Sequence, residues 1–320
     1  MTATRRLAAL AALAGAVTLA GCTGSTPRAT PSPTATAPSP TSSPATPTAG
    51  ASATATPATG LAACPTTPAA ASGLPVLYRG GTPDDLAVAA DGALWVSDAS
   101  SRVVRVVAGA VTRSITGLAD PEGMVPLPGG DVVVAEQGRQ RVVDVHPDGS
   151  RTVLLTLPAA PPGVLGLDGI AWEPRSNAVL VPDSPHGTLT SVPLDDPARA
   201  TTVATGLPRV VGIDPGVNGG GPWLAAEAEA PDGLLLLSGG RATPLGRLAQ
   251  LDDVVLDAGL LYVTDLRNGS VHAVDPGSGA DRTLAAGFGQ PQGLAVLPDG
   301  SLAVADSKRG VVQRLGACRP

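Results

Sequence analysis

Residues 291–315 read PQGLAVLPDGSLAVADSKRGVVQRL, the clearest copy of a unit that recurs along the chain. The unit starts with a four-residue opening motif and an apolar strand, then turns at Asp299-Gly300 into a second apolar strand. That strand ends in an acid, and a polar loop leads to a third strand. A tight Asp-Gly turn between apolar runs is typical of antiparallel β-structure.

Five weaker copies of the opening motif lie upstream. The second residues of the six motifs are Asp84, Glu122, Asp168, Val211, Asp252 and Gln292. Successive positions are 38, 46, 43, 41 and 40 residues apart. A period near 40 residues with about four short strands per unit is the signature of a propeller blade. The sequence therefore predicts an all-β domain over residues 64–320, a six-bladed β-propeller.

The last repeat is one strand short. Only five residues follow its third strand at 311–315, whereas a spare apolar strand, residues 74–78, precedes the first opening motif. We expect this N-terminal strand to complete the last blade, because closing the ring removes the open sheet edges.

The first 21 residues have the features of a signal peptide. Arg5 and Arg6 precede an apolar run, residues 7–19, which is too short for a membrane span. Residues 19–22, LAGC, resemble the bacterial lipobox. The resemblance implies cleavage before Cys22, lipidation of Cys22, and a protein anchored to the extracytoplasmic face of a bacterial cell membrane. An ordinary signal peptide with an incidental cysteine is the alternative, and the Sec and twin-arginine export routes both stay open.

Residues 22–63 are rich in Thr, Pro, Ser and Ala and hold one charged side chain, Arg28. Such a segment cannot bury an apolar face, so we expect a disordered stalk that averages roughly 35 Å from end to end. Cys64 and Cys318 lie at the two ends of the globular zone. In an oxidising compartment they are expected to form a disulfide, with two free thiols as the alternative.

The chain carries a formal net charge of −6 and shows no basic stripe. An acidic domain repels phosphate backbones, so nucleic acid is excluded as a partner.

The pattern of Pro291, Gly293-Leu294 and the later DGSLAVAD run resembles the NHL-repeat propellers. The chain is also similar to the gluconolactonase and senescence-marker-protein family of six-bladed propellers, over roughly residues 74–318. That family binds a divalent metal through acid and amide side chains at the channel and hydrolyses lactones. Repeat patterns of this kind specify the fold better than the activity.

The second positions of the opening motifs should form a ring around the central channel. The resemblance implies a site for Ca²⁺ or another divalent cation, with the following candidate ligands: Asp84, Glu122, Asp168, Asp252 and Gln292. Val211 interrupts this ring, and no asparagine occupies it, unlike in the family. The alternative is that the acids only begin strands, and no catalytic base can be named.

A second set of acids follows 13–16 residues later: Asp98, Glu136, Asp183, Glu227, Asp265 and Asp306. We interpret these as structural, because short acids at strand ends bind the backbone of the following loop. In the fourth repeat Glu229 is an alternative to Glu227.

Two functions fit these features. The first is a membrane-anchored binding or scaffold module with an envelope protein or glycan as its partner, and the second is a metal-dependent lactonase. A quinone-dependent sugar dehydrogenase is less favoured, because the chain has only three histidines and few aromatic residues to hold a flat cofactor.

Overall fold

The structure is a computed structural model that describes residues 60–99, 101–216 and 220–319. The expected signal peptide, Cys22 and nearly all of the expected stalk lie outside the described residues. The first described element is a 3₁₀ turn, η1 (Gly60–Ala63). No helix in this described part of the chain is long and apolar enough to span a membrane.

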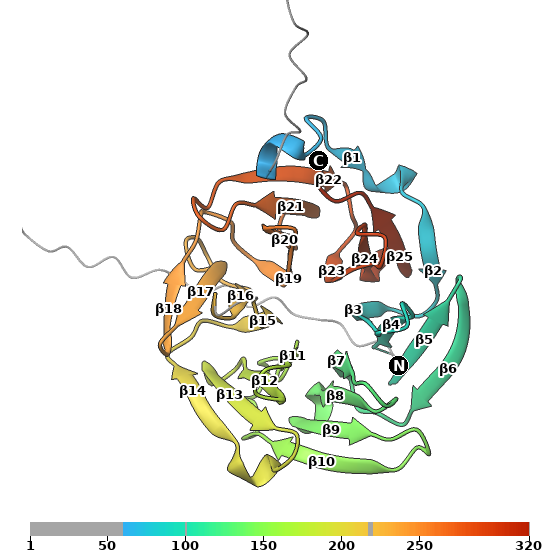
Figure 1. Cartoon of the computed structure of the whole chain (residues 1–320), viewed down its shortest axis with the longest axis vertical. Helices are drawn as coiled ribbons and strands as arrows, with labels where there is room; N and C mark the ends of the chain where they lie inside the picture. The colour runs from blue at the N-terminus through green and yellow to red at the C-terminus, as the bar shows by residue number, and fades with distance from the viewer. Residues whose placement is uncertain (1–59, 100, 217–219, 320) are drawn as a thin grey trace, which may run out of the picture. The chain divides into compact units, whose positions relative to one another are not determined.

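The described residues form six sheets around a common centre, which confirms the six-bladed propeller (Figure 1). Blade 1 holds β3 (Pro83–Val88), β4 (Leu94–Asp98), β5 (Arg102–Val107) and β6 (Ala110–Thr116). Blade 2 holds β7 (Pro121–Pro126), β8 (Val132–Glu136), β9 (Arg141–Val145) and β10 (Arg151–Thr156). Blade 3 holds β11 (Ala171–Glu173), β12 (Ala178–Asp183), β13 (Thr188–Pro193) and β14 (Thr201–Thr205).

Blade 4 holds β15 (Val210–Asp214), β16 (Trp223–Ala226), β17 (Leu234–Ser238) and β18 (Arg241–Pro244). Blade 5 holds β19 (Leu251–Asp257), β20 (Leu260–Asp265), β21 (Ser270–Val274), β22 (Asp281–Ala286) and the added β1 (Ala69–Ala70). Blade 6 holds β23 (Pro291–Val296), β24 (Leu302–Asp306), β25 (Val311–Leu315) and β2 (Val76–Arg79). The remaining 3₁₀ turns are η2 (Ala71–Gly73), η3 (Gln137–Arg139), η4 (Pro197–Arg199) and η5 (Ser307–Arg309).

The N-terminal strand closes the ring as expected. β2 pairs antiparallel with β25, with Val76 opposite Gln313 and Arg79 opposite Val311. The chain also adds a short strand that we did not predict, since β1 pairs in parallel with β22 of blade 5. The N-terminal segment therefore crosses the outer edges of two blades, as the blue ribbon beside β22 and β25 shows in Figure 1.

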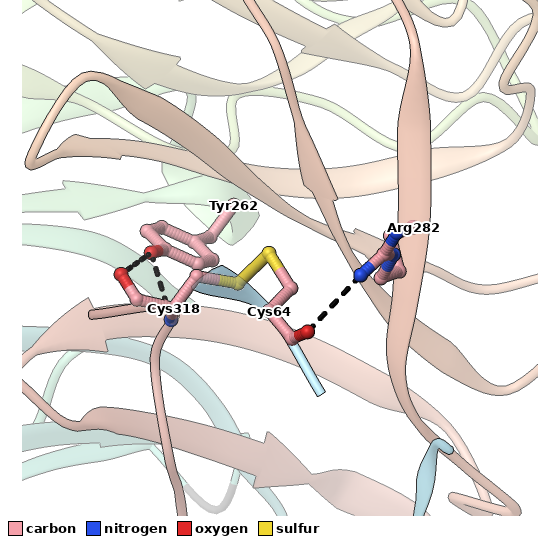
Figure 2. The surroundings of a disulfide bond; sticks show 4 residues. All are labelled: Cys64, Tyr262, Arg282 and Cys318. Atoms are coloured by element: carbon pink, nitrogen blue, oxygen red, sulfur yellow. Dashed lines mark hydrogen bonds between the residues drawn. A yellow bond between two sulfur atoms is a disulfide. The ribbon is translucent and has the colours of Figure 1, made fainter. Parts of the chain in front are cut away.

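The disulfide between Cys64 and Cys318 is confirmed, and it lies on this same seam (Figure 2). Both cysteines are buried. The Tyr262 hydroxyl accepts a hydrogen bond from the Cys318 amide at 3.2 Å and donates to the Cys318 carbonyl at 3.4 Å. Arg282 Nη1 donates to the Cys64 carbonyl at 3.0 Å. The bridge is thus fixed to blade 5 from both of its ends.

The core consists of aliphatic clusters, most of them between adjacent blades. One joins blades 2 and 3 through Val133 and Leu154 on one side and Val179 and Val181 on the other. The second strand of a blade is covered on both faces, so β4 and β8 are buried at every residue. This explains why these strands read as continuous apolar runs rather than alternating ones.

Candidate site in the central channel

The second residues of the opening motifs lie on the innermost strands, except Asp168, which lies three residues before β11, and the structure brings their carboxyl groups together. Burial, followed by electrostatic repulsion from Asp84 and Asp168, raises the pKa of Glu122 well above its usual value. Burial, followed by repulsion from Asp168 and Asp84, likewise raises the pKa of Asp252 well above its usual value. Like charges this close favour the protonated form.

Neighbouring side chains partly compensate the negative charge of this ring. The Arg209 guanidinium lies 3.3 Å from Asp168 Oδ2 and also donates to the Glu227 carboxylate. Burial nevertheless dominates over Arg209 and raises the pKa of Asp168 to about 8. Gln292 Nε2 donates to Asp84, whose pKa burial raises to about 6.

Gln292 is itself held in place, because the Ser307 hydroxyl donates to Gln292 Oε1 at 2.7 Å. Gln292 therefore acts in this structure as a hydrogen-bond partner within the ring.

The ring acids do not converge as a preassembled metal site. In the described part of the chain, only the group of Asp131, Asp144 and His146 places three potential ligand atoms within 4.8 Å of one another. That group belongs to blade 2 and is separate from the ring. The metal-binding role of Asp84, Glu122, Asp168 and Asp252 stays a prediction.

The sequence reasoning missed two further channel acids at the third position of the opening motif, Asp85, which is buried, and Asp253, which is half-buried. The other four repeats have glycine there: Gly123, Gly169, Gly212 and Gly293. A Cβ added at any of these glycines would lie 2.3–2.6 Å from the backbone of the next blade. The break in this glycine pattern was the signal that could have revealed both acids.

Asp253 uses its position to connect blades. Its Oδ2 accepts a hydrogen bond from the Leu294 amide of blade 6 at 2.7 Å, and its Oδ1 accepts from the adjacent Val254 amide at 2.7 Å. Asp214 similarly links blade 4 to the Leu256 amide of blade 5 at 2.9 Å. Burial raises the pKa of Asp253 to about 7 in spite of these bonds.

Asp85 differs from Asp253 in having an unsatisfied atom. Its Oδ2 is buried without a hydrogen-bond partner. Burial, then repulsion from Asp253 and Asp168, raises the pKa of Asp85 well above its usual value. Asp85, Asp214 and Asp253 line a cavity of about 90 Å³ between the inner strands. The channel therefore holds an acidic pocket just below the ring.

The second set of acids binds loop backbone in four repeats. In each of these repeats a backbone amide of the loop donates a hydrogen bond to the carboxylate. The four pairs, donor first, are Thr82 and Asp98 at 3.0 Å, Ala119 and Glu136 at 3.0 Å, Asn268 and Asp265 at 2.8 Å, and Gly289 and Asp306 at 2.8 Å. In the third repeat Asp183 instead contacts His186 Nδ1 at 2.7 Å. The Ser184 hydroxyl beside it donates to the Val210 carbonyl at 2.5 Å, so these three side chains do not form a catalytic triad.

The fourth repeat corrects the expected role of Glu227. Val210 pairs with Ala226, as Pro83 pairs with Asp98 in blade 1, so Ala226 occupies the position of the loop acid. Glu227 comes one residue later and binds Arg209 instead. The alternative, Glu229, forms an exposed ion pair with Arg267.

Comparison with known proteins supports the fold. Residues 288–315 match the NHL repeat. No curated protein sequence matches the chain. Three of the similar solved structures are a putative glucose dehydrogenase of Thermus thermophilus, a gluconolactonase of Xanthomonas campestris and an auxiliary nutrient binding protein of Bacteroides thetaiotaomicron.

The first of these is 18% identical with a TM-score of 0.62, over 76% of this chain and 99% of that protein. The gluconolactonase is 15% identical with a TM-score of 0.59, over 75% and 88% of the two chains. The nutrient binding protein is 12% identical with a TM-score of 0.60, over 75% and 70%. At these identities the likeness is one of fold. The chain is a six-bladed β-propeller whose last blade matches the NHL repeat, and a gluconolactonase is among the proteins of similar fold.

Proposed function

We propose that the protein is a lipid-anchored, extracytoplasmic binding module whose propeller holds a glycan or protein of the cell envelope. The disulfide supports an extracytoplasmic location, because such bridges persist in oxidising compartments. The lipobox at residues 19–22 supports a membrane anchor at Cys22. The nutrient binding protein among the structural neighbours shows that a similar propeller serves in a binding protein.

The observation that carries the binding role is an inter-blade cavity of about 450 Å³ between blades 1 and 2. Trp95 lines it, and the Trp95 Nε1 hydrogen is buried without a partner. Arg113 packs over the Trp95 ring, 5.7 Å from its centroid. A volume of this size suits a small ligand or one unit of a polymer. The Arg113 guanidinium, which also donates to the Gly130 and His146 carbonyls, brings a positive charge to this cavity and favours a ligand rich in hydrogen-bond acceptors.

Binding to purified envelope polysaccharide and to envelope proteins, measured by sedimentation and by biolayer interferometry, tests this proposal. Arg113→Met keeps the aliphatic stem and removes the guanidinium at the cavity, so we expect it to weaken binding about five- to tenfold, the worth of one hydrogen bond to a charged group. Arg241→Met is the matched control, because Arg241 is an exposed residue of blade 4. Equal loss in both variants would place the ligand elsewhere.

The membrane anchor has its own test. Cys22→Ser should abolish incorporation of a labelled fatty acid and release the protein from the membrane fraction. If Cys22→Ser still carries the label and sediments with membranes, the lipobox assignment is wrong.

The lactonase remains as a second candidate because the channel acids have the raised pKa values that acid–base catalysis requires. We rank it lower, because Arg209 and Gln292 occupy the ring and no three ring carboxylates converge on one point. Lactone hydrolysis followed in a pH-stat with added Ca²⁺ should not exceed the buffer rate. Hydrolysis that Asp252→Asn abolishes would reverse the ranking.

A further inference from the structure

Blade 2 contains a group of metal-type ligands far from the acid ring. Asp131 immediately precedes β8, Asp144 lies in β9, and His146 follows β9. His146 Nδ1 lies 3.0 Å from Asp131 Oδ1 and 3.9 Å from Asp144 Oδ2. One ligand atom from each of the three residues falls within 4.8 Å of the others.

The strand register creates this arrangement. Val132 pairs with Val145, so Asp131 and His146 occupy the next opposed positions at the end of the β8–β9 pair. Asp144 and His146 are two residues apart and therefore project from the same face of the sheet. Thr152 of β10 pairs with Asp144 and adds a hydroxyl to that face. Neighbouring strands of one rigid sheet thus present the three ligands.

Two further features distinguish this group from an ordinary surface ion pair, one contact and one buried oxygen without a partner. His146 Nε2 lies 3.1 Å from the Thr152 hydroxyl, which orients the ring and leaves Nδ1 toward the two carboxylates. Histidine ligands of metals are usually held in this way through their second nitrogen. Asp144 Oδ1 is buried and has no hydrogen-bond partner. The carboxylate therefore has a buried oxygen that nothing in the described protein satisfies.

We propose that Asp131, Asp144 and His146 bind a divalent transition metal of the zinc class, with water at the remaining coordination positions. Ligands about 2.0–2.1 Å from a tetrahedral ion lie about 3.3–3.4 Å from one another. The observed separations of 3.0 and 3.9 Å bracket that value, so small side-chain movements bring the ligands into place. Nitrogen and carboxylate ligands without sulfur suit zinc, manganese or cobalt.

The charges of the group agree with this proposal. Two carboxylates, those of Asp131 and Asp144, lie beside one imidazole. This excess of negative charge attracts a cation.

The site is open enough for an ion to enter. The exposed fractions of the His146 and Asp131 side chains are 33% and 35%, whereas that of Asp144 is 15%. The site lies at the sheet end opposite to the opening motif, so it is separate from the channel, whereas Asp131 also lines the edge of the proposed binding cavity.

Equilibrium dialysis of the full-length protein against zinc chloride at pH 7.5, with metal counted by mass spectrometry, tests the proposal. We expect one zinc ion per chain, and at least a tenfold weaker affinity in His146→Ala and in Asp144→Asn. Thr152→Val removes the partner of the second ring nitrogen and should weaken zinc binding about tenfold. His186→Ala is the matched control, because His186 contacts a single carboxylate, that of Asp183, at 2.7 Å.

Cobalt substitution gives a second readout that separates ligand loss from unfolding. The visible absorption of bound Co²⁺ should disappear in His146→Ala while the far-ultraviolet circular dichroism stays unchanged. Absence of bound metal in the unaltered protein at micromolar zinc overturns the proposal. Binding that survives His146→Ala but is lost in Asp252→Asn also overturns it, and would place the metal in the channel.

Discussion

Replacement of both Cys64 and Cys318 by serine should strongly destabilise the protein without changing its fold. The bridge joins positions 254 residues apart, nearly the full length of the propeller. A cross-link over a loop of this length lowers the entropy of the unfolded chain by an amount worth roughly 5.5 kcal/mol at 25 °C. For a domain of this size, each kcal/mol shifts the melting temperature by about 2–4 °C, which predicts a decrease of roughly 10–20 °C.

The folded state should survive this change because non-covalent contacts also close the seam. β2 pairs with β25 along Val76–Arg79. The Gln313 side chain donates to the Ala71 carbonyl at 2.6 Å and lies 3.4 Å from the Leu74 carbonyl. These contacts remain in the serine variant, so its circular dichroism at 25 °C should match that of the oxidised protein.

Thermal and guanidinium unfolding of the oxidised protein, the chemically reduced protein and the serine variant measure the effect. Tyr262→Phe is the control, because it removes the two hydrogen bonds to Cys318 and keeps the bridge. We expect that control to cost about 1 kcal/mol. A serine variant within 1 kcal/mol of the oxidised protein would refute the entropy argument. A serine variant that is unfolded at 25 °C would show that the non-covalent seam cannot close the ring.

Three further predictions concern the channel. The folded pKa values of Asp253 and Asp168, about 7 and about 8, exceed the unfolded value near 4. Their stabilising effect is complete below pH 4 and is fully lost once the pH has risen through 7 and 8, so the free energy of unfolding should fall between about pH 4 and 8; urea titrations at each pH check the sign. Arg209→Met removes the charge that lowers the pKa of Asp168, so the fall should extend above pH 8, and an unchanged pH profile would deny Arg209 its role at the ring. Gly123→Ala should cost more than 2 kcal/mol, because its Cβ would lie 2.4 Å from a backbone nitrogen of the next blade, whereas Gly316→Ala meets nothing within 4 Å and should be nearly neutral.

The sequence predicted the fold because every blade repeats the same local chemistry. Apolar strands and tight turns recur at a period near 40 residues, and counting them exposed one missing strand and one spare. The disulfide followed from the export signal and from the positions of Cys64 and Cys318. β1 could not be predicted, since Ala69 and Ala70 pair only through their backbones and leave no side-chain pattern.

The channel was harder to predict because its contacts join residues of different blades. Arg209 reaches Asp168, 41 positions earlier in the chain, and no local pattern links the two residues. Glu227 lies at nearly the sequence spacing of the other loop acids, yet the strand register assigns the loop-acid position to Ala226. Spacing along the chain located this position only to within one residue. A shift of one residue along a strand moves a side chain to the opposite face of the sheet.

Burying several acids close together in the channel costs free energy, and their hydrogen bonds offset this cost only in part. Asp253 serves a structural purpose, since it bonds the backbone of blade 6 where four other repeats have glycine. Asp85 also replaces that glycine, but it leaves one buried oxygen unsatisfied. A glycine at Asp85 would relieve both the repulsion and the unsatisfied oxygen. Strain of this kind persists where a site does more than hold the structure together, which makes the channel the place to test for a small cation or proton-coupled ligand if the cavity at Trp95 binds nothing.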